Sequence, residues 1–248
     1  MRRFFVPADS LVNDIVTLSG ETLHHLAVVL RLSRGDEILL LDGRGNFCHC
    51  RISILEKNHG LAEVLRRWHE AETACPVHLL QGLPKADKLE LILQKGTELG
   101  ISSFSPLDCE RSVVRLADSR QDQRHQRWQK IVREAARQSC RSRLPQLLPV
   151  RSLPEAVKHC EEELRLMLWE EESRPLADLL PPSPPSSIAL LVGPEGGFSA
   201  DEAAMARDAG FVPVRIGPRI LRSETAGFAA AAILQYLYGD LGLRKKGP

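Results

Sequence analysis

The sequence predicts an α/β protein with a mainly parallel sheet, preceded by a small β-rich domain. From residue 77 onward, apolar runs of strand length alternate with stretches of helical periodicity, a pattern typical of a parallel sheet. Residues 1–70 instead contain short strand-like runs separated by glycine-containing turns. A chain of 248 residues suits one large or two modest domains. We therefore expect two domains, over residues 1–70 and 75–248, with a linker near 69–76.

The first domain is expected to be a small barrel. Its strands are predicted at residues 4–6, 15–18, 37–41, 47–55 and 61–67, with one helix at 21–30. Gly-containing turns at 42–46 and 58–60 separate the last three strands.

The second domain is expected to alternate strands with helices. Strands are predicted at residues 77–83, 101–107 and 164–169, and helices at 87–99, about 119–140, 153–160 and 225–238. The inner stripe of the long helix is predicted to be Trp128, Val132, Ala135 and Ser139, with Lys130, Arg133, Arg137 and Arg141 nearly opposite. The proline-rich stretch 181–187 should be a surface loop.

Two related motifs organise this second domain, LLVGPEGGFSADE at 190–202 and VRIGPRILRSETAG at 214–227. Each begins as a buried strand, stops at a Gly-Pro pair and passes into a helix start. Ser199 and Glu202 are spaced as a capping box, and Ser223 or Thr225 is expected to cap the second helix. In an open α/β sheet ligands bind at the carboxyl ends of the strands. Both loops should therefore border one ligand site.

The chemistry of these loops suits a small cofactor better than a phosphate. Gly196 and Gly197 let backbone groups approach a ligand closely, while Pro194 and Pro218 restrict the entry of each turn. The sequence contains no GxxxxGK[ST] phosphate-binding loop. The alternative is that GPEGG is only a glycine turn before a capped helix.

Composition excludes several other classes of protein. No apolar run approaches the roughly 18 residues of a membrane helix, and the N-terminus lacks a signal-peptide core, so we expect a cytoplasmic protein. The six cysteines form no CxxC pair and are expected to be small core residues rather than metal ligands.

The net charge is only +1, but residues 111–143 hold ten Lys or Arg against three Asp or Glu. That polarity is typical of a nucleic-acid face or of a solvated helix.

The motifs resemble the RsmE family, S-adenosylmethionine (SAM)-dependent methyltransferases with the trefoil-knotted SPOUT fold. The resemblance also covers RRFFV at 2–6, HHLAVVLRLSRGDEILLLDG at 24–43, QGLPKADKLELILQKGTELG at 81–100 and RWQKIVREAARQSCR at 127–141. It implies a PUA-like RNA-binding barrel, a knotted methyltransferase domain, a homodimer, and methylation of N3 of one uridine in 16S rRNA of the small ribosomal subunit. A metal is not expected.

The resemblance also implies which residues hold SAM. The implied residues are Glu170, Leu191, Gly193, Pro194, Glu195, Gly196, Gly197, Ile216, Gly217, Ile220, Leu221 and Thr225. Backbone groups would read the adenine, with Ile220 and Leu221 as apolar walls.

For the transfer itself, Arg222 is the first candidate to stabilise the uracil anion, because its guanidinium is always charged and donates two parallel hydrogen bonds. The alternative for Arg222 is a structural salt bridge to Glu224. Glu195 and Glu224 are candidate proton acceptors. Either carboxylate could instead cap a turn or helix, with water taking the proton.

Candidate RNA contacts lie in both domains. They are Arg2, Arg3, His24, His25, Arg31 and Arg34 in the first, and Lys85, Lys88, Lys95, Arg111, Arg115, Arg133, Arg137, Gln138 and Arg141 in the second. For each the alternative is an ordinary solvated surface or structural position.

Two other functions stay open at this point. One is ribose 2′-O-methylation of RNA, the commoner activity of related knotted folds. The other is a non-catalytic ribosome-assembly factor that binds RNA without SAM.

Overall fold

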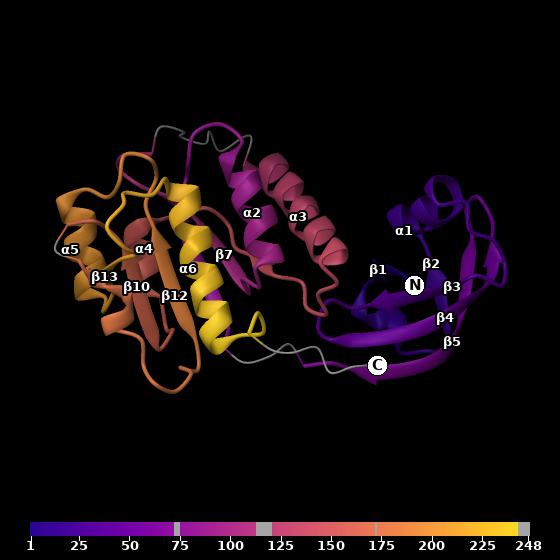
Figure 1. Ribbon diagram of the computed structural model, residues 1–248. Coiled ribbons are helices and arrows are strands. Elements are labelled where there is room, and N and C mark those ends of the chain that lie inside the picture. Colours follow the sequence, from indigo (N-terminus) through magenta and orange to yellow (C-terminus); the bar gives the residue numbers. More distant parts are fainter. Residues whose placement is uncertain (72–74, 113–120, 172, 243–248) are drawn as a thin grey trace. The chain divides into compact units, whose positions relative to one another are not determined.

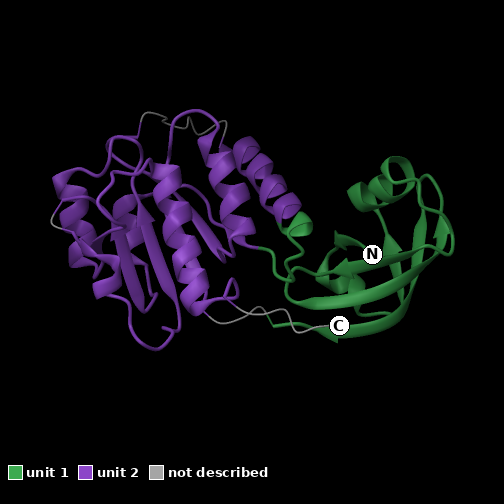
Figure 2. Cartoon of the chain, in the orientation of Figure 1, with its two compact units in different colours: residues 1–72, 136–144 green, residues 73–135, 145–248 purple. Residues whose placement is uncertain are grey.

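The computed structural model describes residues 1–71, 75–112, 121–171 and 173–242. Its contacts divide the chain into two compact units (Figure 2). Unit 1 comprises Met1–Glu72 together with Ala136–Leu144, and unit 2 comprises Thr73–Ala135 and Pro145–Pro248. No helix in the described ranges is both long and apolar enough to cross a bilayer.

Unit 1 is built on one five-stranded sheet. Its strands are β1 (Arg2–Phe5), β2 (Ile15–Leu18), β3 (Glu37–Leu41), β4 (Asn46–Leu55) and β5 (Gly60–His69), in the order β1-β3-β4-β5-β2. The β1–β3 pair is parallel and the others are antiparallel. Among the described strands no ladder joins β1 to β2, so the expected barrel has two unpaired edges.

The helix expected at 21–30 is split into two short pieces. They are α1 (Gly20–His24) and a π-helical turn labelled η2 (His25–Val29), and a 3₁₀ turn η1 (Ala8–Leu11) precedes β2. Leu23 and Leu26 face the core, whereas Val28 and Val29 are exposed. Arg31 then takes the left-handed conformation, with φ of 52°, which ends the helical stretch.

Apolar side chains are buried on both faces of the sheet of unit 1. Because successive side chains of a strand point to opposite faces, Phe4 and Leu40 enter one core, while Phe5 and Leu41 enter another. The second core is completed by Ala136, in the returning segment 136–144. The expected domain boundaries, 1–70 and 75–248, did not include this return.

Hydrogen bonds hold the returning segment in unit 1. Arg3 Nη1 donates to the Cys140 carbonyl oxygen at 2.8 Å, and the Leu144 N–H donates to the Gly43 carbonyl oxygen at 2.9 Å. The segment is therefore an integral part of this unit.

Unit 2 contains an eight-stranded sheet in which every ladder is parallel. Its strands are β6 (Val77–Gly82), β7 (Ser103–Asp108), β8 (Gln146–Leu147), β9 (Arg151–Ser152), β10 (Leu164–Leu168), β11 (Arg174–Pro175), β12 (Ile188–Val192) and β13 (Val212–Arg215). The order is β11-β13-β10-β12-β6-β7-β8, and β9 also pairs with β7. Since all strands run the same way, the loops that follow β6, β7, β10, β12 and β13 meet at one edge.

Helices cover both faces of this sheet (Figure 1). They are α2 (Lys88–Glu98), α3 (Gln121–Gln138), α4 (Leu153–Lys158), α5 (Ala200–Asp208) and α6 (Ser223–Tyr238), with a 3₁₀ turn η4 (Leu176–Asp178). Helices α4 and α5 pack in the core that contains Met167 and Leu191. On the opposite face α6 contacts α2 and β12. The predicted α/β architecture is confirmed.

The stripe predicted for α3 is confirmed at three positions and wrong at the fourth. Trp128, Val132 and Ala135 are buried, at 5%, 1% and 2% exposure. Ser139 lies beyond the last residue of the helix and is exposed, so Ala136 is the fourth buried residue.

Candidate active site

The first motif loop follows β12 and is held by its predicted capping box. The Glu202 N–H donates to Ser199 Oγ at 3.2 Å, and the Ser199 N–H donates to Glu202 Oε2 at 3.0 Å. The other Glu202 oxygen accepts from the Glu110 N–H at 2.8 Å. One carboxylate therefore fixes both the start of α5 and the loop after β7.

The second motif loop follows β13, and its helix is not capped as predicted. Arg222 is the N-cap residue of α6, with no side-chain capping bond, and Ser223 is the first helical residue. The Ser223 hydroxyl instead donates to the carbonyl oxygen of Gly193. Capping by Ser223 or Thr225 was wrong because Ser223 joins the two motif loops to each other.

Gln81, near the end of β6, reinforces this junction. Its Nε2 donates to Ser223 Oγ at 2.9 Å and to the Gly82 carbonyl oxygen at 3.0 Å. The side chain is 1% exposed, and its Oε1 has no hydrogen-bond partner among the described residues. Gln81 is not among the predicted site residues, because its partner Ser223 lies 142 residues away in the sequence.

Close backbone approaches shape the first motif loop. A Cβ added to Gly82 would lie 2.5 Å from Pro194 Cδ, so only glycine fits beneath the loop. On the other side Arg111 Nη1 donates to the Gly196 carbonyl oxygen at 3.2 Å. Arg111, a predicted RNA contact, is thus also part of the loop's own support.

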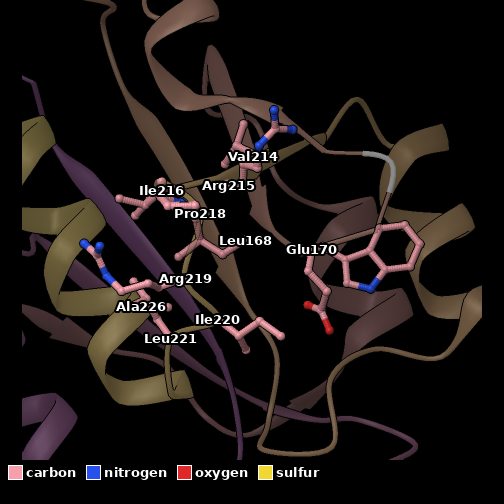
Figure 3. Close-up of a pocket in the computed structure, with 12 residues that line it drawn as sticks. Leu168, Glu170, Val214, Arg215, Ile216, Pro218, Arg219, Ile220, Leu221 and Ala226 are labelled. Atoms are coloured by element: carbon pink, nitrogen blue, oxygen red, sulfur yellow. The ribbon is translucent and has the colours of Figure 1, made fainter.

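Two adjoining cavities, each of about 360 Å³, lie between the loops. In the first (Figure 3), Ile216, Pro218 and Ile220 of the second motif loop surround the hollow, and Glu170 extends into it after β10. The second is bordered by Gly193–Glu195, Arg222 and Lys88. The residues that line both are Leu168, Trp169, Glu170, Ile220, Leu221 and Ala226. The two cavities therefore share one wall.

A charged cluster borders the second cavity. Lys88 Nζ lies 3.0 Å from Glu195 Oε1 and 3.4 Å from Glu224 Oε2. The Glu195 carboxylate also accepts from the Lys85 N–H, at 3.1 Å and 3.2 Å. Arg222, on the same cavity, forms no ion pair with any described residue and is exposed. The predicted alternative, a salt bridge from Arg222 to Glu224, is wrong because Lys88 takes that carboxylate.

The cluster keeps its charges. Partial burial acts to raise the pKa of Glu195, but the hydrogen bonds from Lys88 and from backbone N–H groups outweigh burial and hold it below its ordinary value. The hydrogen bond to Glu195 raises the pKa of Lys88, with a further contribution from the charge of Glu224. Glu195 is consequently a carboxylate, and Lys88 an ammonium, at neutral pH.

Most residues predicted to hold the cofactor line these cavities. Those that do are Glu170, Gly193, Pro194, Glu195, Gly197, Ile216, Gly217, Ile220 and Leu221. Leu191, Gly196 and Thr225 do not line either cavity. The side chain of Leu191 packs in the core with α4 and α5 instead. Lining residues that sequence analysis missed include Trp169, Phe198 and Ala226, which carry no polar signature.

The predicted RNA contacts are scattered. In unit 1 Arg2 Nη1 donates to the Leu30 carbonyl oxygen at 3.5 Å, and the ring of His25 packs edge-on against Phe4. His24, Arg31 and Arg34 are exposed. The segment 136–144, with Arg137, Gln138 and Arg141, also belongs to unit 1.

Unit 2 holds the remaining predicted contacts. Lys85 and Arg133 are exposed, and Lys95 pairs with Glu98 at 2.9 Å. Arg115 lies outside the described residues.

Among the residues that the structure describes, no group of three or more His, Cys, Asp or Glu side chains is arranged so that it could hold a metal ion. Cys48, Cys50, Cys75, Cys109 and Cys160 are buried as free thiols, and Cys140 is exposed.

Comparison with known proteins relates this geometry to a family. A family model described as RNA methyltransferase domain matches residues 71–235, and one described as RNA methyltransferase PUA domain matches residues 18–65. The chain is 34% identical to the ribosomal RNA small subunit methyltransferase E of Bacillus subtilis, covering 95% of this chain and 96% of that protein. It is 35% identical to the protein of that name from Mycobacterium bovis, covering 92% and 88%.

A solved structure agrees with these matches. The crystal structure of a ribosomal RNA small subunit methyltransferase E from Neisseria gonorrhoeae, bound to S-adenosyl methionine, superposes with a TM-score of 0.89 at 37% identity, covering 97% of this chain and 99% of that one. The chain therefore belongs to the RNA methyltransferase family of the ribosomal RNA small subunit methyltransferases E, the RsmE family whose motifs it carries.

Proposed function

We propose that this protein transfers the methyl group of SAM to N3 of a uridine in 16S rRNA of the small ribosomal subunit. The observation that carries the proposal is the pair of motif loops, joined through Ser223 and Gly193, which frame two adjoining cavities. Arg222 borders the second cavity and has no ion-pair partner within the described ranges. The names of the relatives agree with it.

The residues around the cavities fit SAM. Ile216, Ile220 and Leu221 offer apolar walls for the adenine, and backbone groups of the glycine-containing loops provide directional contacts. SAM carries a sulfonium and an ammonium, and the carboxylate of Glu170 borders both cavities. When bound, SAM supplies an electrophilic methyl group. The protein's task is to place that group and the base, since positioning alone can lower a barrier by about 7–11 kcal/mol.

Arg222 is proposed to stabilise the uracil anion. Loss of the N3 proton spreads negative charge over N3, O2 and O4, and a guanidinium beside the cavity can donate hydrogen bonds to these atoms. Glu195 is proposed as proton acceptor, because it is ionised and lines the same cavity. Glu224, which lines neither cavity, is the weaker candidate.

Unit 1 and the basic residues of both units are proposed to bind the rRNA. Its PUA-domain match and the exposed Arg31 and Arg34 support this role. We also propose a cytoplasmic homodimer with the trefoil knot, which the family resemblance implies. Each lysine or arginine that neutralises a phosphate should steepen the salt dependence of binding by about 0.7–0.9 log units per log salt.

A methyl-transfer assay tests the proposal. Small subunits that lack the modification are incubated with the protein and SAM labelled in the methyl group, and the labelled nucleoside is identified by mass spectrometry. The expected product is 3-methyluridine at a single position. Label on a ribose 2′-oxygen would reassign the activity, and no label together with no heat of SAM binding would leave only an RNA-binding role.

A further inference from the structure

Lys88 occupies a position that the predicted role in phosphate binding does not explain. It is the first residue of α2 and lines the second cavity. Its ammonium contacts one carboxylate from each motif, at 3.0 Å to Glu195 and 3.4 Å to Glu224. The side chains of Glu195 and Glu224 are 23% and 14% exposed, so water screens them only in part.

Arg222 has no ion-pair partner among the described residues. It is two residues before Glu224 and borders the cavity that Glu195 also borders. A guanidinium matches a carboxylate in geometry and normally binds one when it is near. Both acids are instead bound to Lys88.

We propose that Lys88 is a positioning residue, which occupies Glu195 and Glu224 so that the guanidinium of Arg222 stays available to the substrate. This inference rests on the proposed function, because it assigns Lys88 a role only if Arg222 binds the uracil anion. Without the ammonium, two carboxylates would face Arg222 uncompensated, and Glu224, on the adjoining helical turn, would capture it.

The first test compares single variants of the full-length protein. Lys88→Met should lower the turnover of methyl transfer about 10- to 100-fold, a range typical of directly coupled charged groups. Lys88→Arg should retain most turnover, because a cation still holds both acids. Lys158→Met, which removes an exposed lysine of α4 away from both cavities, is the matched control and should match wild type.

The second test separates this role from a merely structural one. In the double variant Lys88→Met/Glu224→Gln the competing carboxylate is gone, so turnover should recover about tenfold over Lys88→Met alone. A structural role predicts the opposite, since removing a second charged group from a damaged site would not repair it. A double variant no faster than Lys88→Met would overturn the inference.

A readout besides activity is the crystal structure of the Lys88→Met variant without ligand. The expected result is an Arg222 guanidinium nitrogen within about 4 Å of a Glu224 oxygen, the usual limit of an ion pair. An Arg222 that stays unpaired there would also overturn the inference. Failure of the proposed function looks different, because wild-type protein would then label no uridine while the geometry of the variant could still change.

Discussion

Unit 2 holds two networks of charged and polar side chains, at opposite ends of one sheet, and only one has the properties of a site. The first is the cluster of Lys88, Glu195, Glu224 and Arg222 at the carboxyl edge. The second lies toward the amino ends of the strands, around His78 of β6.

The second network has the residue types of a hydrolytic triad. His78 Nδ1 lies 2.6 Å from Glu162 Oε1, and His78 Nε2 lies 2.9 Å from Ser105 Oγ. Cys160 Sγ donates to the other Glu162 oxygen at 2.9 Å. Yet Ser105 is only 3% exposed, and burial, with the Glu162 hydrogen bond, raises the pKa of Cys160 to about 12. The polar groups of this network hydrogen-bond to one another, and these bonds link β6 to β7 and to the segment that precedes β10.

The two networks differ in whether a ligand can reach their polar groups and in whether one charged group is left without an ion-pair partner among the described residues. At the carboxyl edge the group proposed to act, Arg222, has no ion-pair partner in the part of the chain that the structure describes, and it borders a cavity of about 360 Å³. At the amino end each group has a partner and the nucleophile is covered. Residue types at hydrogen-bonding distance therefore do not identify a functional site unless one group is left free to act.

The largest effect on methyl transfer is expected from a substitution of Arg222, in the network at the carboxyl edge. Arg222→Ala should lower turnover about 100- to 1000-fold, as loss of one donor to a developing anion does elsewhere. SAM affinity, measured by calorimetry, should stay near the wild-type value because Arg222 is assigned to the base. A large loss of SAM affinity would instead assign Arg222 to the structure of the cofactor pocket.

A smaller effect is expected from a substitution of Gly82, whose backbone lies beneath the first motif loop. In Gly82→Ala the new Cβ would meet Pro194 at 2.5 Å, so the loop must shift. Overpacking of this kind costs about 1–3 kcal/mol of unfolding free energy, and SAM affinity should fall with it. Denaturant melts and calorimetry measure the two quantities. Unchanged SAM affinity would show that the position of Pro194 does not matter for binding.

The smallest effect on methyl transfer is expected in the second network. The hydrogen bond from His78 lowers the pKa of Glu162 to about 2 from an ordinary 4.5, against the opposing effect of burial. The ionised Glu162 carboxylate therefore stabilises the folded state fully above about pH 4.5, and this contribution is lost as the pH falls toward about 2.

Glu162→Gln should therefore remove stability that wild type has at neutral pH and flatten the loss of stability between those pH values. Thermal melts as a function of pH measure this. Glu161→Gln, at an exposed neighbour, is the control and should keep the wild-type pH dependence. Methyl transfer at neutral pH should be unchanged in both folded variants, and a strong loss in Glu162→Gln would contradict the division between the networks.

Much of the fold could be predicted from local pattern. The strand ends at Gly82, Leu168 and Val192 were predicted within one residue, because buried parallel strands are continuous apolar runs bounded by Gly, Pro or charged residues. The capping box at Ser199 was predicted from spacing alone, since both of its hydrogen bonds lie within one helical turn.

Site residues were predictable only where their chemistry is local. The glycine loops and Arg222 stood out by composition and by family motif. Lys88 looked like one more basic residue of a helix, and Gln81 like one more strand residue. Neither role was visible, because Lys88 is 107 residues from Glu195 and 136 from Glu224, and Gln81 is 142 from Ser223.

By itself, then, the sequence determined the strand and helix pattern, the two motif loops and the family. Only the tertiary structure decided that Ser223 joins the loops instead of capping α6, that Lys88 holds both acids, and that residues 136–144 complete the core of unit 1. The physical reason is range. Periodicity and capping act within a few residues, whereas the partner of a buried polar group or an apolar face is chosen by where the folded backbone brings distant segments together.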